Sequence, residues 1–183
     1  IFGPDTVFYT ERTDSMWIQA ILSFQKLGFH VNDPSVLHPP SSDGIDRTQW
    51  LYMYYTALAN SDAEAGRLNR NIIGLASSVD GGKTWTDHGI VVGQNNGLDA
   101  TGAWSPSALV QGSEIWVYYH TNEPGPRILR TRMNANGWQK ITTEVVRMPS
   151  LQYFVSNVDV SMDGRKFVML ANTTDLKNIV RYV

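Results

Sequence analysis

Short apolar segments alternate with turn-forming residues along this 183-residue chain. The segments are rich in β-branched and aromatic residues, and none keeps a helical period over about 11 residues. Residues 61–68 are expected to form at most one helical turn within a loop. The expected fold class is therefore all-β. The predicted strands are 6–11, 17–24, 35–37, 50–58, 72–77, 89–92, 107–110, 114–121, 128–133, 141–146, 155–161, 166–171 and 179–183.

Three groups of these strands share one order of sequence features. Each group begins near residue 32, 104 or 157 with a short strand, passes through a turn containing Gly or Asp, and enters a second strand, aromatic in the first two groups. The first two groups then add two further strands. Four antiparallel strands per repeat are typical of β-propeller blades.

The predicted organisation is a single β-propeller domain, or a fragment of one, over residues 1–183. Its blades are expected at about residues 31–100, 104–148 and 153–183, and the strands at 6–24 would complete the third blade. About three blades would leave sheet edges and a hydrophobic face uncovered. We therefore expect either further blades in a longer parent chain or a homo-oligomer that completes the propeller.

One hairpin has a distinctive sequence, Ser78-Val-Asp-Gly-Gly-Lys-Thr-Trp85. Ser78 and Asp80 are expected to bind backbone N–H groups of the turn, its two glycines permit positive φ, and Trp85 would fill the gap between adjacent sheets. The motif resembles the Asp-box of sialidases and related propellers. In a blade it would join the third strand to the fourth, on the face opposite the substrate channel, so we expect its role to be structural.

Composition narrows the function classes. A net charge of −2 provides no basic surface for a nucleic-acid backbone. The chain has no cysteine, which excludes disulfides, thiol catalysis and cysteine-bound zinc. Its four histidines lack metal-ligand spacing, and no apolar run reaches the roughly 18 residues of a membrane span. We expect no metal, no cofactor, no nucleic acid and no membrane partner.

The chain begins at Ile1 rather than Met, and no signal peptide is recognisable. We therefore expect a processed or trimmed chain. Its location stays open, with secreted and periplasmic as the options considered.

In a propeller, the first strand of each blade lines the central channel, and its starting residues lie at the substrate-facing end. Alignment of the repeats places Asp33, Ser105 and Asp159 at these positions. Two carboxylates, Asp33 and Asp159, thus stand at equivalent channel positions, where they are candidates for chemistry. The structural interpretation is that Asp33 and Pro34 form a turn and that Asp159 caps a backbone amide.

An ordered set of motifs runs through residues 30–172. It comprises Asn-Asp-Pro-Ser-Val, Trp-Leu-Tyr-Met-Tyr-Tyr-Thr, the Asp-box hairpin and Trp-Ser-Pro. This set resembles the five-bladed β-propeller glycosidases of family 43 and the related invertase-like enzymes. The resemblance implies that Asp33 is a general base that activates water, and that Trp104 and Ser105 lie beside the sugar. It also implies that Asp159 orients the acid and tunes its pKa, although Val160 stands where the family usually has proline.

The third carboxylate of that family is a glutamate that opens a later blade, and no such blade is recognisable here. Glu123 is the candidate acid, because loops between second and third strands border the substrate face. The structural interpretation is an exposed loop glutamate. His120 would hydrogen-bond a sugar or a carboxylate, or cap its strand, and Trp104 would stack on a sugar or pack between blades. The candidate catalytic residues are Asp33, Asp159 and Glu123, and the candidate substrate-binding residues are Asn32, Trp104, Ser105 and His120.

Three functions follow from these observations. The first is a glycoside hydrolase, or the N-terminal part of one, acting on an arabinan- or xylan-type carbohydrate with Asp33 as base. The second is a non-catalytic propeller that binds glycans or another partner. The third is a sialidase-like protein, for which only one Asp-box and no Arg-Ile-Pro signature are present.

Overall fold

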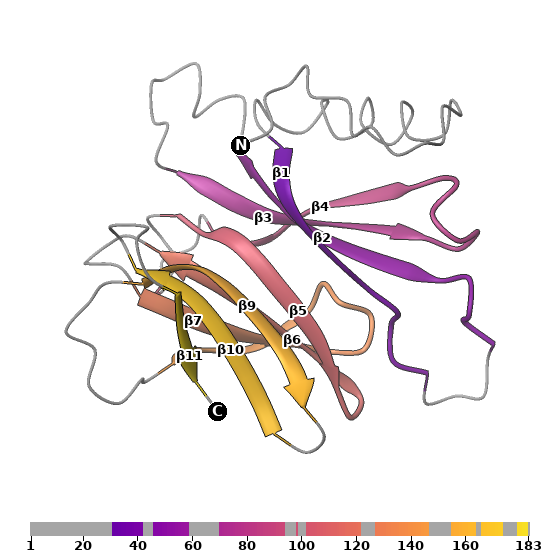
Figure 1. Ribbon diagram of the computed structural model, residues 1–183. Coiled ribbons are helices and arrows are strands. Elements are labelled where there is room, and N and C mark those ends of the chain that lie inside the picture. The colour runs from indigo at the N-terminus through magenta and orange to yellow at the C-terminus, as the bar shows by residue number, and fades with distance from the viewer. Residues whose placement is uncertain are drawn as a thin grey trace, which may run out of the picture.

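The computed structural model describes residues 31–41, 46–58, 70–93, 98, 102–121, 127–146, 155–163, 166–173 and 179–182 (Figure 1). The predicted strands within 6–24, the helical turn at 61–68 and the candidate acid Glu123 lie outside these residues. The strands are β1 (Val31–Leu37), β2 (Leu51–Leu58), β3 (Asn71–Ser78), β4 (Thr86–Val92), β5 (Trp104–Gln111), β6 (Glu114–Thr121), β7 (Arg127–Met133), β8 (Lys140–Val145), β9 (Val155–Asp163), β10 (Lys166–Thr173) and β11 (Ile179–Tyr182).

The strands form three separate antiparallel sheets in chain order. The first sheet has the order β1-β2-β3-β4, the second β5-β6-β7-β8, and the third β9-β10-β11. We call these sheets blades 1, 2 and 3. Each strand pairs with the next along the chain, so every blade is a meander. The predicted all-β class and the four-stranded blades are confirmed.

Several strands begin earlier than their apolar patterns indicated, by three or four residues in β1, β4 and β5. β1 begins at Val31 and β5 at Trp104, whereas alternation of side chains becomes visible only at residues 35 and 107. The first part of each strand contains an irregularity in the ladder, between Asn32 and Ser35 in β1 and between Trp104 and Ser107 in β5. Such an irregularity hides the period-two signal that a regular strand gives.

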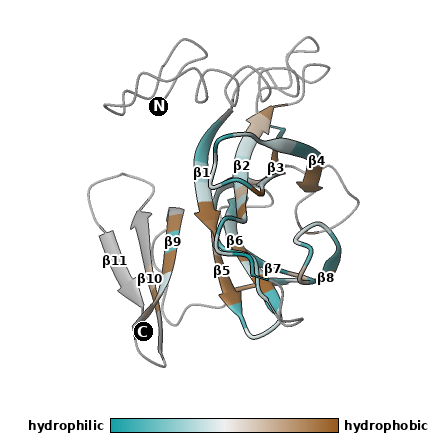
Figure 2. Cartoon of the chain, turned by 90° about the vertical axis from the view of Figure 1, so that its right-hand side faces the viewer, coloured by the Kyte–Doolittle hydropathy of each residue, from teal (hydrophilic) through white to brown (hydrophobic). Residues whose placement is uncertain are grey.

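The hydrophobic core lies between the blades. One cluster joins buried residues of blade 1, such as Tyr54 and Leu75, to buried residues of blade 2, such as Ile115 and Tyr119. A second cluster joins blade 2 to Val158, Val160 and Met169 of blade 3. Figure 2 shows hydrophobic segments of β5 and β9 on neighbouring strands. Burial between stacked sheets thus supplies the main driving force for the arrangement.

The innermost strands of the three blades lie next to one another. β5 contacts both β1 and β9, and β6 also contacts β9. Figure 1 shows β5 and β9 running alongside each other at the edge of their blades. Residues at equivalent positions of β1, β5 and β9 are therefore brought to one side of the molecule.

The hairpin of residues Ser78–Trp85 connects β3 to β4, as its position in the repeat predicted. Asp80 Oδ1 accepts hydrogen bonds from Thr84 N at 2.9 Å and from the Ser78 hydroxyl at 2.8 Å, and Asp80 Oδ2 accepts one from the Thr84 hydroxyl at 2.6 Å. These donors lower the pKa of Asp80 to about 2. Ser78 Oγ accepts the Gly82 N–H at 2.9 Å, and both turn glycines have positive φ. Trp85 packs on Tyr55 and its neighbours within blade 1.

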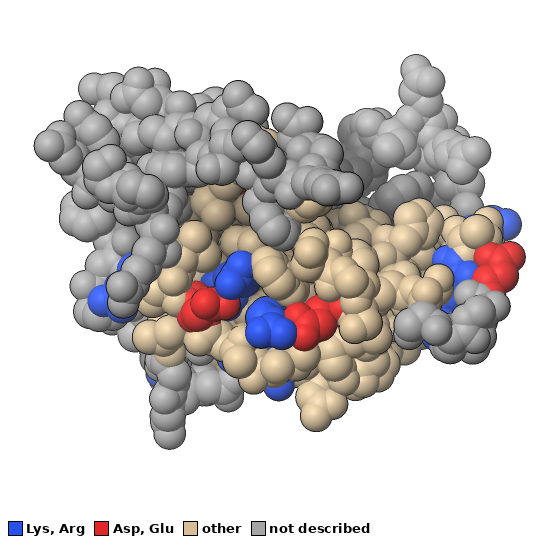
Figure 3. Space-filling view, turned by 90° about the horizontal axis from the view of Figure 1, so that it is seen from below, with Lys and Arg blue, Asp and Glu red and all other residues tan. Residues whose placement is uncertain are grey.

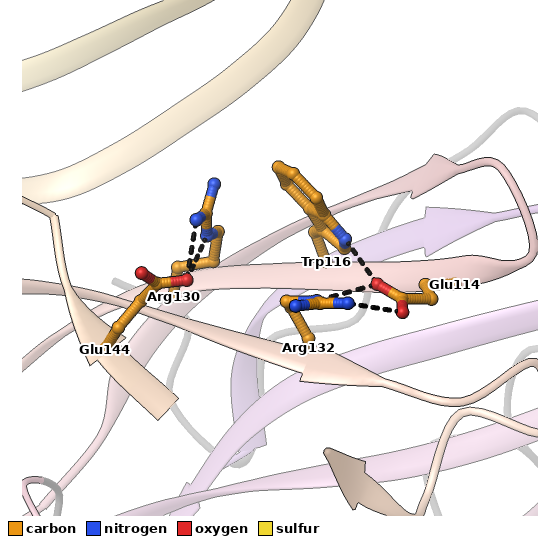
Figure 4. Close-up of polar contacts among 5 residues, drawn as sticks. All are labelled: Glu114, Trp116, Arg130, Arg132 and Glu144. Carbon is orange, nitrogen blue, oxygen red and sulfur yellow. Dashed lines mark hydrogen bonds and ion pairs between the residues drawn. The ribbon is translucent and has the colours of Figure 1, made fainter. Parts of the chain in front are cut away.

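Blade 2 carries two ion pairs on one face. Figure 4 shows Arg130 with Glu144 and Arg132 with Glu114, drawn from β6, β7 and β8. The Arg130 guanidinium also lies 4.1 Å from the ring centroid of Trp116. Figure 3 shows acidic and basic side chains in adjacent pairs of opposite sign on the lower face of the molecule. Arg130 and Arg132 of blade 2 are thus each paired with a glutamate of opposite charge.

No helix in the described part of the chain is long and apolar enough to cross a membrane.

Candidate active site at the inner strands

The site is built on a β-bulge that recurs in blades 1 and 2. Asp33 has φ of 49° and Ser105 has φ of 50°, and each is followed by proline. A residue other than glycine at positive φ is uncommon and costs on the order of 1–3 kcal/mol, and such residues cluster at functional sites. Because the same strained conformation occurs at the same point of two blades, this position is a candidate functional site. A bulge also redirects the side chain of the bulged residue.

The two bulged residues meet across the boundary between their blades. The Ser105 hydroxyl donates a hydrogen bond to Asp33 Oδ2 at 2.9 Å. The Ser105 N–H donates to Thr56 Oγ1 of β2 at 2.8 Å. Asp33 is exposed, so its carboxylate is held by Ser105 and still open to a ligand.

The residue before Asp33 carries a polar atom with no assigned partner. The side-chain oxygen of Asn32 is buried and accepts no hydrogen bond from the residues that the structure describes. A buried acceptor without a donor is costly, by about 1–3 kcal/mol, and calls for an explanation such as water or a ligand. Asn32 therefore places a buried polar atom beside the exposed carboxylate of Asp33.

Trp104 and His120 form an aromatic pair at the equivalent place in blade 2. Their rings stack with centroids 5.5 Å apart and an interplanar angle of 15°. Burial lowers the pKa of His120 to about 4, and the nearby Asp33 carboxylate opposes this shift. The imidazole is therefore neutral at neutral pH. His120 covers one face of Trp104, which is itself half-buried.

The register of blade 3 corrects the alignment made from sequence. β9 changes register against β10 between Ser156 and Val158, which places the bulge at Asn157. Contacts between blades agree, because Ser35 Oγ accepts the Ala108 N–H at 2.9 Å and Ser107 Oγ accepts the Val160 N–H at 3.0 Å.

The residue that aligns with Asp33 and Ser105 is therefore Asn157, and Asp159 aligns with Ser35 and Ser107. The error was a shift of two residues. Such a shift preserves the alternation of a strand, so the apolar pattern cannot detect it.

Asp159 lies on β9 next to the inner strand of blade 2. It is exposed, and its Oδ1 accepts a hydrogen bond from the Ser107 hydroxyl at 3.0 Å. Asp159 was expected to cap a backbone amide. Among the contacts that the structure gives, its carboxylate instead accepts a hydrogen bond from a hydroxyl of the neighbouring blade. A role for Asp159 in the chemistry stays a prediction.

Residues that sequence reasoning did not select also shape the site. Thr56 supports the Ser105 backbone, while Ser35 and Ser107 link successive inner strands. A signal for them was present, because Pro-Ser follows the bulged residue in both blades and Thr56 and His120 each follow a Tyr-Tyr pair. Among the described side chains, no group of three or more His, Asp or Glu residues is arranged to hold a metal ion.

Comparison with solved structures identifies the architecture. The chain is similar to a family 117 glycoside hydrolase from the marine bacterium Zobellia galactanivorans, at 17% identity and a TM-score of 0.60, over 82% of this chain and 50% of that one. It is also similar to an α-L-arabinofuranosidase from Lactobacillus brevis, at 14% identity and a TM-score of 0.56, over 79% of this chain and 45% of that one.

An α-L-arabinanase from Cellvibrio cellulosa, complexed with arabinohexaose, gives 15% identity and a TM-score of 0.52, over 93% of this chain and 53% of that one. No family model matches the sequence, and no curated protein matches it. The chain spans about half the length of these solved structures. Its fold is part of the β-propeller found in these glycoside hydrolases.

Proposed function

We propose that this protein is a glycoside hydrolase, or part of one, that acts on an arabinan- or xylan-type carbohydrate with Asp33 as general base. The observation that carries the proposal is the strained, exposed Asp33, whose carboxylate accepts a hydrogen bond from Ser105 of the next blade. A base that activates water must be ionised, fixed in orientation and open to substrate. The Ser105 hydrogen bond and the bulge both supply the fixed orientation, and Asp33 is exposed.

The groups around Asp33 suit a sugar. Asn32 directly precedes Asp33 and is half-buried, and it is the candidate for a further polar contact to the sugar. Trp104 directly precedes Ser105 and is half-buried, and it supplies an apolar surface, while the Ser105 hydroxyl supplies a further polar contact. In this proposal Asn32, Trp104 and Ser105 bind the sugar next to the bond that is cleaved.

A complete mechanism requires a second carboxyl group to protonate the leaving oxygen. In inverting glycosidases the two carboxyl groups stand about 6.5–9.5 Å apart, with a water molecule between base and sugar. Glu123 is the candidate acid of this chain, and Asp159 is the candidate for tuning its pKa. The similar solved structures include an α-L-arabinofuranosidase and an α-L-arabinanase, which favours arabinose-containing substrates as the first to be tested.

The test compares wild-type protein with Asp33→Asn and with a matched control, Asp46→Asn. Asp46 is an exposed aspartate in the loop between β1 and β2, where its Oδ1 accepts the Thr48 N–H. Hydrolysis of linear arabinan, an aryl α-L-arabinofuranoside and an aryl β-D-xyloside is followed by release of reducing sugar or chromophore. We expect Asp33→Asn to lower kcat by about 10²–10⁴-fold, because a general base contributes about that much. Asp46→Asn should retain wild-type activity.

Equal kcat for wild type and Asp33→Asn would exclude Asp33 as the base. If wild-type protein binds these carbohydrates in calorimetry but releases no product, the alternative of a non-catalytic glycan-binding propeller holds instead. In that case Asp33→Asn should weaken binding and Asp46→Asn should not.

A further inference from the structure

The hydrogen bond from Ser105 N to Thr56 Oγ1 joins blades 1 and 2, and the positions of both residues recur in blades 2 and 3. Thr56 lies opposite Asn32 in the β1–β2 ladder, one residue before the bulge at Asp33. His120 lies opposite Trp104 in the β5–β6 ladder, one residue before the bulge at Ser105. Thr56 and His120 thus occupy the same place in successive blades.

Blade 3 is stacked on blade 2 in the same way as blade 2 on blade 1. The hydrogen bond from Ala108 N to Ser35 Oγ, at 2.9 Å, recurs one blade later as the bond from Val160 N to Ser107 Oγ, at 3.0 Å. From one pair of blades to the next, Ser35 therefore corresponds to Ser107, and Ala108 corresponds to Val160. By the same correspondence, Thr56 is equivalent to His120, and Ser105 is equivalent to Asn157. The backbone amide that Thr56 binds in blade 2 therefore has its equivalent in the amide of Asn157.

We propose that a ring nitrogen of His120 accepts the backbone N–H of Asn157, and that His120 is a positioning residue for the bulge of blade 3. In blade 1 a threonine hydroxyl at the same place fixes the backbone of Ser105 at 2.8 Å. The proposal concerns the arrangement of the inner strands β5 and β9, so its test is independent of the proposed hydrolytic activity.

The chemistry of imidazole agrees with this role. Only the neutral ring has a nitrogen that accepts a hydrogen bond, because both nitrogens are donors in the protonated ring. His120 is 7% exposed, and its burial keeps the ring neutral well below the usual pKa of histidine. Asp33 on β1 is the charged group that acts on the ring. β5 contributes the Trp104 ring, and β7 contributes Ile128 opposite His120.

The direct test is a nuclear magnetic resonance measurement on uniformly ¹⁵N-labelled wild-type protein. An N–H···N hydrogen bond gives a measurable scalar coupling between the two nitrogens. We expect a coupling between the Asn157 amide nitrogen and one ring nitrogen of His120. An assigned Asn157 amide without this coupling would overturn the proposal, and no substitution is needed to obtain that result.

Two variants separate the acceptor from simple packing. His120→Phe keeps an aromatic ring to stack on Trp104 but has no acceptor, and His120→Thr installs the side chain that blade 1 uses. Exchange of the Asn157 amide with solvent should quicken by about tenfold in His120→Phe, relative to the Ala108 amide, because one hydrogen bond is lost. His120→Thr should exchange more slowly than His120→Phe. Unchanged exchange in His120→Phe would contradict the proposal.

Discussion

At the scale of single residues, a few polar groups lie where the inner strands deviate from regular geometry. Asp33 and Ser105 hold positive φ angles that their side chains disfavour, and the contact between them helps to offset that strain. Next to them, His120 is buried with a pKa of about 4. The strain or burial of each of these groups costs folding free energy, and such costs are characteristic of functional positions.

The buried His120 makes stability depend on pH at mildly acidic values. Its pKa is about 4 when folded, against 6.5 for an unperturbed histidine, so between these values the unfolded chain binds a proton that the folded chain does not. The contribution of His120 to the free energy of unfolding should therefore fall as pH decreases from about 6.5 to 4, by about 3 kcal/mol, and level off below 4. Urea unfolding of wild type and His120→Thr at pH 7.5 and 4.5 measures this contribution. An identical loss of stability in both proteins would contradict it.

At the scale of elements, the blades are meanders whose turns are fixed by local hydrogen bonds. The hairpin between β3 and β4 shows this most clearly, since Ser78 and Asp80 satisfy its backbone donors and Trp85 donates its indole N–H to Gly82 O at 3.0 Å. The bulges of β1 and β5 are the second device, and they place Asp33 and Ser105 at the boundary of two blades. The hairpin sets the register of the strands within blade 1. The bulges place the residues of the candidate site at the boundary between blades 1 and 2.

Ser78→Ala should destabilise the protein without affecting the channel. Ser78 is buried, and its hydroxyl both accepts the Gly82 N–H and donates to Asp80. Loss of these contacts should lower the free energy of unfolding by about 1–3 kcal/mol. Lys83→Ala, an exposed substitution in the same turn, is the matched control and should stay within about 0.5 kcal/mol of wild type. Chemical denaturation of both variants checks this, and equal stabilities would refute the structural role of Ser78.

At the scale of the whole molecule, stability comes from blade stacking. The two larger hydrophobic clusters lie between blades, and the serine contacts from Ser35 to β5 and from Ser107 to β9 fix the alignment of the inner strands. The third blade docks on the second through β9, while Asp159 adds its contact to the Ser107 hydroxyl. The arrangement of the candidate site is therefore a property of neighbouring blades, and no single blade contains it.

Ser35→Ala and Ser107→Ala form a matched pair that tests blade stacking. Each variant removes the acceptor of one backbone N–H between inner strands. Ser35→Ala should speed exchange of the Ala108 amide and leave the Val160 amide unchanged, and Ser107→Ala should do the reverse. Amide exchange measured by nuclear magnetic resonance distinguishes the two. A uniform effect of either variant on both amides would show that the blades do not open separately.

The all-β class, the four-stranded repeat and the hairpin at Ser78–Trp85 followed from the sequence, because period-two alternation, turn residues and short-range hydrogen bonds act within a few residues of one another. Asp33 and Ser105 were also found at equivalent positions, since each precedes a Pro-Ser pair. The contact between their side chains, the burial of the Asn32 side-chain oxygen and the neutral state of His120 were decided by tertiary structure. These features depend on how one blade stacks on the next. The register of β9 shows why the sequence pattern does not reveal this stacking. A shift of two residues leaves the pattern of side chains along a strand unchanged, so only the hydrogen bonds between strands and blades determine whether Asn157 or Asp159 aligns with Asp33.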